Sequence, residues 1–217
     1  MSKALLVALA LVFALSAGVS ARSFGTPNVL INGSWQTGNI DGSPGWTKSP
    51  AKDTGYVHNL ITGMGNWGRA PGETDDYGWG DESNWWYHNV GWIYQDYTIF
   101  APDMYTMELS AWLAVFDDSA LPTYVELQLW VDGVLPDENK ARLERAGGGG
   151  TGWQLYSIQW TGYVVQTVRA RLEGKADGQG GWGLFIADGV DLEFVPEPGT
   201  FVALGAGLLG LALRRRR

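Results

Sequence analysis

Hydrophobic and polar residues alternate with a period of two along several stretches of this chain. In residues 123–131 one phase is apolar and the other is aromatic or polar: Val125, Leu127, Leu129 and Val131 against Tyr124, Glu126, Gln128 and Trp130. Residues 163–173 alternate similarly, with Arg169 and Arg171 in the polar phase. Such alternation predicts strands that bury one face and turn the other outward.

A third stretch, residues 104–116, has large apolar residues in both phases, because Trp112 and Phe116 interrupt the alternation. This pattern favours a strand with both faces covered. Clusters of Asp and Gly separate the stretches and mark turns. The predicted strands are 28–36, 89–100, 104–116, 123–131, 152–160, 163–173 and 183–194.

These elements predict an all-β protein, a two-sheet antiparallel sandwich of the jelly-roll type. Residues 37–88, rich in Gly, Trp and Asp, are expected to form long loops with short strands. No linker divides the predicted strands, so residues 22–194 are expected to form one β-sandwich domain.

The two ends of the chain have a different character. Lys3 precedes an apolar run over residues 4–15, and small residues lead to Ala21, which is the pattern of a secretory signal peptide cleaved after residue 21. Near the other end, residues 201–213 carry no charge and no Pro. As a helix this run would reach about 20 Å, less than the roughly 30 Å of a hydrocarbon core, so it predicts a short transmembrane segment that anchors poorly.

The last four residues, Arg214, Arg215, Arg216 and Arg217, would stay on the cytoplasmic side, which places the preceding chain outside. The triplet Pro196, Glu197 and Pro198, the Gly-rich apolar run and the arginine cluster together resemble the PEP-CTERM sorting signal over residues 195–217. This resemblance implies processing by an exosortase-type enzyme, transient anchoring in the inner membrane, and a final place at the cell envelope surface or outside the cell. It implies sorting and names no activity, although the signal occurs in bacteria that make exopolysaccharide.

Charge and composition exclude some partners. Removing both terminal segments would take away five of the 15 Lys and Arg residues and at most one of the 23 Asp and Glu residues. The remaining domain would carry a net charge of about −12 or −13. Such a surface repels nucleic acid, and the absence of Cys excludes disulfides and thiolate metal sites.

A second resemblance covers most of residues 28–194. Residues 28–35 resemble the first strand of jelly-roll carbohydrate-binding modules through Asn28, Asn32, Gly33 and Trp35. Residues 91–115 resemble that family's aromatic strand, turn and following strand, and residues 183–194 resemble its closing strand. The resemblance implies a carbohydrate-binding sandwich.

In that family a Glu near the first strand and a closing Asp pair often bind a structural calcium ion. Here the corresponding positions are Gln36 and Asp188-Gly189, and a neutral amide is a weaker ligand for a hard cation. The loop over residues 72–82 offers further oxygen donors between glycines, among them Asp75 and Asp81. Asp188, Asp75 and Asp81 are therefore candidate calcium ligands, and no other cofactor is expected.

Catalytic motifs are sparse. His58 and His88 are the only histidines, and neither accompanies a Gly-x-Ser-x-Gly nucleophile elbow. The adjacent acidic pairs at 75–76 and 117–118 are typical of solvated turns. The sequence therefore favours a protein that is not an enzyme.

The high number of aromatic residues is the feature of the composition that says most about function, because a domain of this size cannot bury all 12 Trp residues. Their rings can stack on sugar rings while amides and carboxylates hydrogen-bond the hydroxyl groups. The candidate glycan-binding residues share predicted strand faces: Tyr124, Glu126, Gln128 and Trp130 on 123–131, and Trp92 and Tyr94 on 89–100.

The leading hypothesis is an exported, non-catalytic carbohydrate-binding sandwich whose ligand is an envelope or extracellular polysaccharide. Two alternatives stay open: a structural surface or biofilm-matrix protein whose aromatic residues only pack, and a glycosidase or lyase. A row of exposed rings would favour the first hypothesis, and two carboxylates about 5–9 Å apart in a groove would favour a glycosidase.

Overall fold

The computed structural model describes residues 29–31, 33, 35, 45–48, 56–60, 67–74, 77–84 and 88–194. The chain divides into two compact units, of which the larger is Asn28–Glu193. The signal-peptide segment 1–21 and the sorting segment 195–217 lie outside the described residues. Within the described part of the chain, no helix has the length and apolar character needed to cross a membrane.

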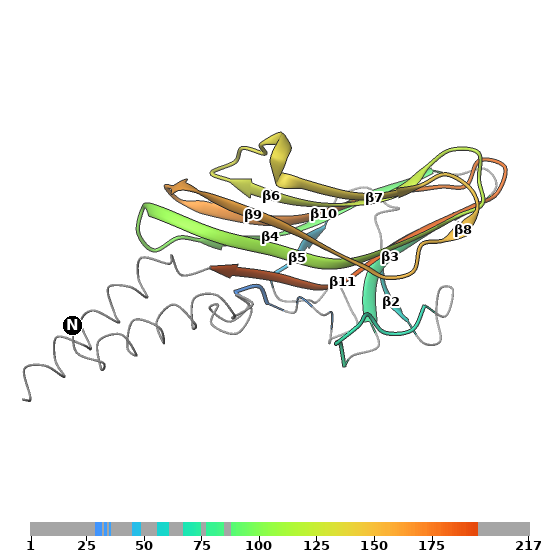
Figure 1. Cartoon of the computed structure of the whole chain (residues 1–217), viewed down its shortest axis with the longest axis horizontal. Coiled ribbons are helices and arrows are strands. Elements are labelled where there is room, and N and C mark those ends of the chain that lie inside the picture. Colours follow the sequence, from blue (N-terminus) through green and yellow to red (C-terminus); the bar gives the residue numbers. More distant parts are fainter. Residues whose placement is uncertain are drawn as a thin grey trace, which may run out of the picture. The chain divides into compact units, whose positions relative to one another are not determined.

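Two β-sheets make up the larger unit (Figure 1). Sheet A has the strand order β1-β4-β10-β6-β7, with bounds Thr47–Lys48, His88–Thr98, Thr167–Asp177, Thr123–Val131 and Lys140–Arg145. Sheet B has the order β2-β3-β11-β5-β8, with bounds Tyr56–Asn59, Tyr77–Asn84, Trp182–Phe194, Asp103–Asp117 and Gly149–Gly150. Strand β9 (Gln154–Val164) also pairs with β5, and the short 3-10 turn η3 (Asp137–Asn139) precedes β7.

The chain crosses between the sheets at nearly every connection. It passes from β3 in sheet B to β4 in sheet A, then to β5 in B and β6 in A, and turns within sheet A to β7. The alternation resumes through β9, β10 and β11. This is the strand order of a jelly roll, built from two interlocked Greek keys, so the predicted fold class is confirmed.

The core lies between the sheets and follows the predicted alternation. On β6 and β10 every second residue is fully buried or nearly so: Val125, Leu127, Leu129, Val131, Val168, Ala170 and Leu172. Burying a Leu or Val side chain contributes about 1.5–3 kcal/mol relative to leaving it exposed, so these strands hold the sandwich together. Their other phase is left for the outer surface of sheet A.

Strand β5 is covered on both faces, as its sequence predicts. Leu109 and Leu113 are fully buried in one phase. In the other phase, Ala114 packs in a cluster with Leu60 and Ile186, against which Trp67 and Trp153 also pack. Several of the Trp residues are therefore taken up by covering sheet B.

The prediction of a strand over residues 28–36 is wrong for the residues described there. Residues 29–31, 33 and 35 form bends, turns and irregular chain, although the Val29 amide donates to the Leu192 carbonyl of β11. Trp35 is fully buried with φ 58°, and its ring centroid lies 4.8 Å from that of Trp46. Left-handed backbone at a non-glycine residue breaks the extended path that a strand requires.

Five described strands lie outside the seven predicted ranges. Strands β1, β2 and β3 lie within the 37–88 region, where short strands were expected, whereas β7 and β8 have only six and two residues. The alternation of β7 is too short to distinguish a strand from a loop. The predicted strands 152–160 and 163–173 do form, displaced by a few residues, as β9 and β10.

Candidate functional site

The outer face of sheet A gathers the six predicted glycan-binding residues. Strand β10 lies between β4 and β6, and its register places Arg171 between Tyr94 and Gln128. Glu173 likewise lies between Trp92 and Glu126. Because alternate residues share a face, Trp92 and Tyr94 of β4 join Tyr124, Glu126, Gln128 and Trp130 of β6 on one surface, although 30 or more residues separate the two groups in sequence.

The four aromatic rings of this face are half-buried, and each lies close to an arginine. The Arg142 guanidinium carbon lies 4.0 Å from the Tyr124 ring centroid, and that of Arg169 lies 3.8 Å from the Tyr94 ring centroid. Arg171 lies between two indoles, 5.1 Å from the Trp92 centroid and 5.7 Å from the Trp130 centroid. Cation–π contacts of this kind contribute about 0.5–2 kcal/mol each, so they hold the rings in defined positions.

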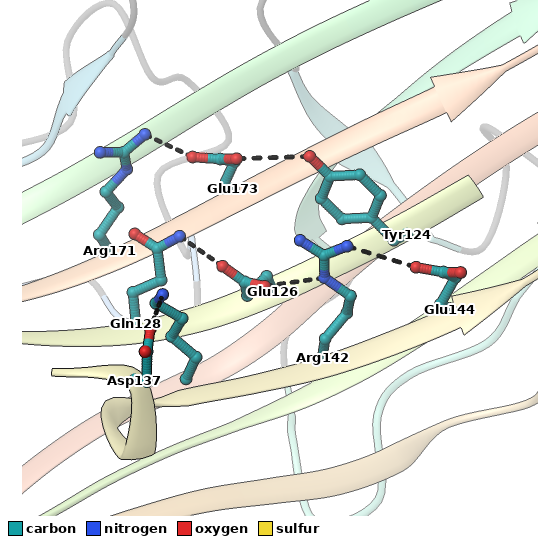
Figure 2. A network of polar contacts seen from close by, with 9 residues as sticks. Tyr124, Glu126, Gln128, Asp137, Arg142, Glu144, Arg171 and Glu173 are labelled. Carbon is teal, nitrogen blue, oxygen red and sulfur yellow. Dashed lines mark hydrogen bonds and ion pairs between the residues drawn. The ribbon is translucent and has the colours of Figure 1, made fainter. Parts of the chain in front are cut away.

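A hydrogen-bonded chain runs along β6 and ends on β7, and Figure 2 shows its part from Gln128 through Glu126 to Arg142. Trp130 Nε1 donates to Gln128 Oε1 at 3.0 Å, and Gln128 Nε2 donates to Glu126 Oε1 at 2.6 Å. The second oxygen of Glu126 accepts from Arg142 Nε at 2.8 Å. Glu126 and Gln128 are only 6% and 4% exposed, although they point to the outer face, because the longer side chains around them cover them.

A second part of the network crosses from β10 to β6. Figure 2 shows Glu173 between Arg171 and Tyr124: Arg171 Nη2 donates to Glu173 Oε2 at 2.5 Å, and the Tyr124 hydroxyl donates to Glu173 Oε1 at 3.3 Å. Burial first, and then the Glu173 carboxylate, raise the pKa of the Tyr124 hydroxyl above its ordinary value. The hydroxyl therefore keeps its proton and acts as a donor at neutral pH.

Five cationic side chains lie on this face, and each has an acidic partner within 4 Å. The pairs are Arg142 with Glu126, Arg169 with Asp96, Arg171 with Glu173, Lys175 with Asp177, and Lys140 with Asp137. Arg142 also pairs with Glu144 of β7, so among the described residues five cationic groups meet six carboxylates on this face, in a protein whose formal net charge is −8. The surface is suited to groups that need both hydrogen-bond donors and acceptors.

Sequence reasoning missed the arginines as members of the site. It identified Arg169 and Arg171 as the polar phase of their strand, but nothing in that phase shows which aromatic rings they contact. Arg142 lies on β7, which the alternation did not reveal. The contacts join residues that are far apart along the chain, so only the strand order determines them.

Glu126 and Glu173 are directly opposite each other in the β6–β10 register, so they are the acidic pair of this face to compare with that of a glycosidase. In a glycosidase one carboxyl group must donate a proton to the leaving group. Here arginine N–H groups donate to both carboxylates, which is the arrangement of an ion-pair network. His58 and His88 lie on β2 and β4, and their side chains are outside the described part of the structure.

The candidate calcium ligands do not form one group in the part of the chain described here. Asp81 pairs with Phe185, and Asp188 is three residues further along β11, or about 10 Å. Asp75 lies outside the described residues. Across the described residues no group of three or more His, Asp or Glu side chains could hold a metal ion.

Comparison with known proteins identifies one sequence motif. Residues 194–217 match the PEP-CTERM protein-sorting motif, which contains the predicted sorting residues Pro196 to Pro198 and Arg214 to Arg217. The chain therefore carries this motif, which implies export and processing at a membrane. No curated protein sequence matches the chain.

Several solved structures are similar to this chain. The TmCBM61 module in complex with β-1,4-galactotriose is 14% identical, with a TM-score of 0.49 over 77% of this chain and 98% of that one. The CBM22-1 xylan-binding domain of Xyn10C from Paenibacillus barcinonensis is 12% identical (TM-score 0.46; 76% and 92%). The K3 adhesin domain of Lys-gingipain from Porphyromonas gingivalis is 11% identical (TM-score 0.47; 76% and 99%).

Proposed function

We propose that this chain is an exported, non-catalytic glycan-binding protein and that the outer face of sheet A is its binding surface. The observation that carries the proposal is that four rings share one surface with carboxylates and an amide; the rings are half-buried, not the row of fully exposed rings that the sequence hypothesis called for, and each lies beneath an arginine. The ring surface that the arginines leave open would stack on the apolar faces of sugars, while the polar groups between the rings would bond hydroxyl groups. Because the network already orders these side chains, binding would cost little side-chain entropy.

The pairing of charges on this face supports a class of ligand. Each arginine already has a carboxylate partner, and the domain as a whole is acidic, so a strongly anionic polymer would meet net repulsion. A neutral or cationic polysaccharide would meet paired donors and acceptors instead. From Tyr124 to Trp130 the face runs about 20 Å along β6, which is long enough for several sugar units.

The sorting motif supports the place of action. The chain would be exported with its N-terminal signal peptide, anchored transiently through residues 201–213, and processed by an exosortase-type enzyme. It would then reach the envelope surface or the extracellular matrix, where polysaccharide is the abundant ligand. We propose this route as the context in which the sheet A face works.

Affinity electrophoresis through gels that contain polysaccharides tests the proposal. We expect wild type to be retarded by at least one neutral polysaccharide, and Trp92→Ala and Trp130→Ala to bind about ten- to a hundredfold more weakly. This range corresponds to the roughly 1–3 kcal/mol that a stacked Trp contributes. Trp182→Ala is the matched control, because Trp182 is 46% exposed and lies outside sheet A.

Equal retardation of all three variants, with unchanged melting temperatures, would show that the binding face is elsewhere. Failure of the wild type to bind any glycan would favour a structural surface or matrix protein whose aromatic residues only pack. Release of reducing sugar by the wild type, abolished in Glu126→Gln, would favour a glycosidase instead.

A further inference from the structure

Large apolar side chains are exposed at one end of the sandwich. The exposed fractions are 98% for Phe100, 51% for Met104, 63% for Val134, 58% for Tyr163 and 56% for Val165. Exposed apolar residues are usually scattered singly over a surface. A group of five at one end is a feature that core packing does not explain.

Phe100, Val134 and Val165 lie in three loops that hydrogen bonds join, and Met104 and Tyr163 lie on the adjoining strands β5 and β9. The Ile99 amide, next to Phe100, donates to Gln166 O at 2.8 Å, and the Asp132 amide donates to Thr167 O at 2.9 Å. Met104 and Tyr163 are direct partners in the β5–β9 register. The β4–β5 loop, the turn after β6 and the β9–β10 turn therefore present one surface, which we call the apolar tip and define as Phe100, Met104, Val134, Tyr163 and Val165.

Strand β11 ends at the same end of the sandwich. The Asp118 amide, just after β5, donates to the Trp182 carbonyl at the start of β11, and β11 and β5 are neighbours in sheet B. Strand β11 therefore runs back toward the end at which β5 begins. Figure 1 shows its arrowhead on the side of the β4–β5 loop.

The chain after β11 is short before it becomes apolar. Seven residue steps separate Phe194 from Phe201, the first residue of the apolar run, and they span at most about 25 Å when fully extended. While the run is inserted in a membrane, the apolar tip is therefore held close to the bilayer surface. The opposite end of the sandwich lies at the far end of strands that are up to 15 residues long.

We propose that the apolar tip enters the lipid interface while residues 201–213 anchor the chain, so that the domain has a fixed orientation on the membrane before processing. Phe and Tyr side chains favour the headgroup region. The carboxylates beside the tip already accept backbone hydrogen bonds, Asp103 from Met104 N and Asp132 from three amides. The acidic domain disfavours an anionic surface, so the partner is a zwitterionic lipid headgroup layer.

Site-specific labelling tests this, because the chain has no native Cys. Full-length Val134→Cys, Val165→Cys and Leu121→Cys proteins, each carrying the environment-sensitive dye NBD, are reconstituted singly into phosphatidylcholine nanodiscs. Leu121 is the matched control, since it is 39% exposed and lies between β5 and β6 at the opposite end. We expect brominated phosphatidylcholine to quench the dye at Val134 and Val165 several-fold more than at Leu121.

A second variant separates lipid contact from proximity alone. Phe100→Ser combined with Tyr163→Ser removes apolar surface without touching the core, and it should reduce quenching at Val134 to the level seen at Leu121. Equal, weak quenching at all three positions in the otherwise wild-type protein would overturn the proposal. Dye protection that appears only in nanodiscs with two copies, without bromolipid quenching, would assign the tip to a second copy and overturn it as well.

Discussion

Asp132 joins two loops of the sandwich through a single carboxylate. Its Oδ2 accepts from the Val165 amide at 2.7 Å, and its Oδ1 accepts from the Gln166 and Thr167 amides at 2.8 and 2.9 Å. Asp132 has φ 48°, a left-handed conformation that Asp adopts more readily than most residues. Desolvation by itself would raise the pKa of the Asp132 carboxyl group, but the hydrogen bonds from the three amides together lower this pKa below its ordinary value.

We expect Asp132→Ala to lower the free energy of unfolding by about 1–2 kcal/mol near neutral pH, because three amides lose their acceptor and Ala tolerates the left-handed backbone poorly. Since the folded-state pKa is lowered, the contribution is complete above the unfolded pKa of about 3.9 and is lost as the pH falls through the folded-state pKa. The difference between the two proteins in urea titrations should therefore narrow as the pH falls below about 4, leaving only the part that comes from the left-handed backbone.

Asp137→Ala is the control for this measurement, because Asp137 is also exposed but makes only a surface ion pair with Lys140. Its effect should be much smaller than that of Asp132→Ala, because exposed ion pairs contribute little. A difference between wild type and Asp132→Ala that remained constant down to strongly acidic pH would show that the charge of the carboxylate does not matter to the loops.

At the scale of the elements, sheets A and B approach each other closely where β10 faces β11. Gly174 of β10 has no side chain, and the Phe185 ring of β11 occupies the space beside it, so that an added Cβ would collide with that ring. The Phe185 centroid lies 5.1 Å from that of Trp79 on β3. The absence of one side chain on sheet A therefore makes room for an aromatic pair on sheet B.

Gly174→Ala should destabilise the domain by about 1–3 kcal/mol, because overpacking forces the fully buried Phe185 ring to move. The near-UV circular dichroism of the Trp79–Phe185 pair should change with it. Gly150→Ala is the matched control, since its Cβ would lie 3.6 Å from Trp67, an ordinary contact. Two variants of equal stability would contradict the packing of Phe185 against β10.

At the scale of the whole molecule, the sorting motif at residues 194–217 implies an anchored stage followed by a processed stage. As a helix the apolar run would be shorter than a bilayer core, and the arginines would hold it in place only until cleavage. The sheet A face belongs to the domain that remains, so glycan binding would not depend on the removed tail.

Intact-mass analysis of protein recovered from the envelope or the medium tests this division. We expect the mature protein to lack the tail from Pro196 onward, and a variant with Pro196, Glu197 and Pro198 all changed to Ala to keep its tail and stay in the membrane fraction. Recovery of Arg214–Arg217 on the mature wild-type protein would show that no such cleavage occurs.

The sequence by itself determined the features that depend on neighbouring residues. Alternation with a period of two identified β6 and β10 and the phase that each buries, and the mixed phases of residues 104–116 identified a strand covered on both sides. These patterns can be recognised in the sequence because adjacent side chains of a strand point to opposite faces, whichever strands lie beside it. The order of triplet, apolar run and arginines likewise identified the sorting motif.

Only the tertiary structure decided which strands are neighbours, and with them the chemistry of the candidate site. Arg171 contacts Trp92 and Trp130 because β10 lies between β4 and β6, and Glu126 is buried because Arg142 of β7 covers it. The strand predicted over 28–36 failed for the related reason that Trp35 takes a left-handed backbone to bury its ring. Such contacts join residues that are far apart along the chain. They form only because the sheet places particular strands side by side, and the alternation within one strand does not show which strands those are.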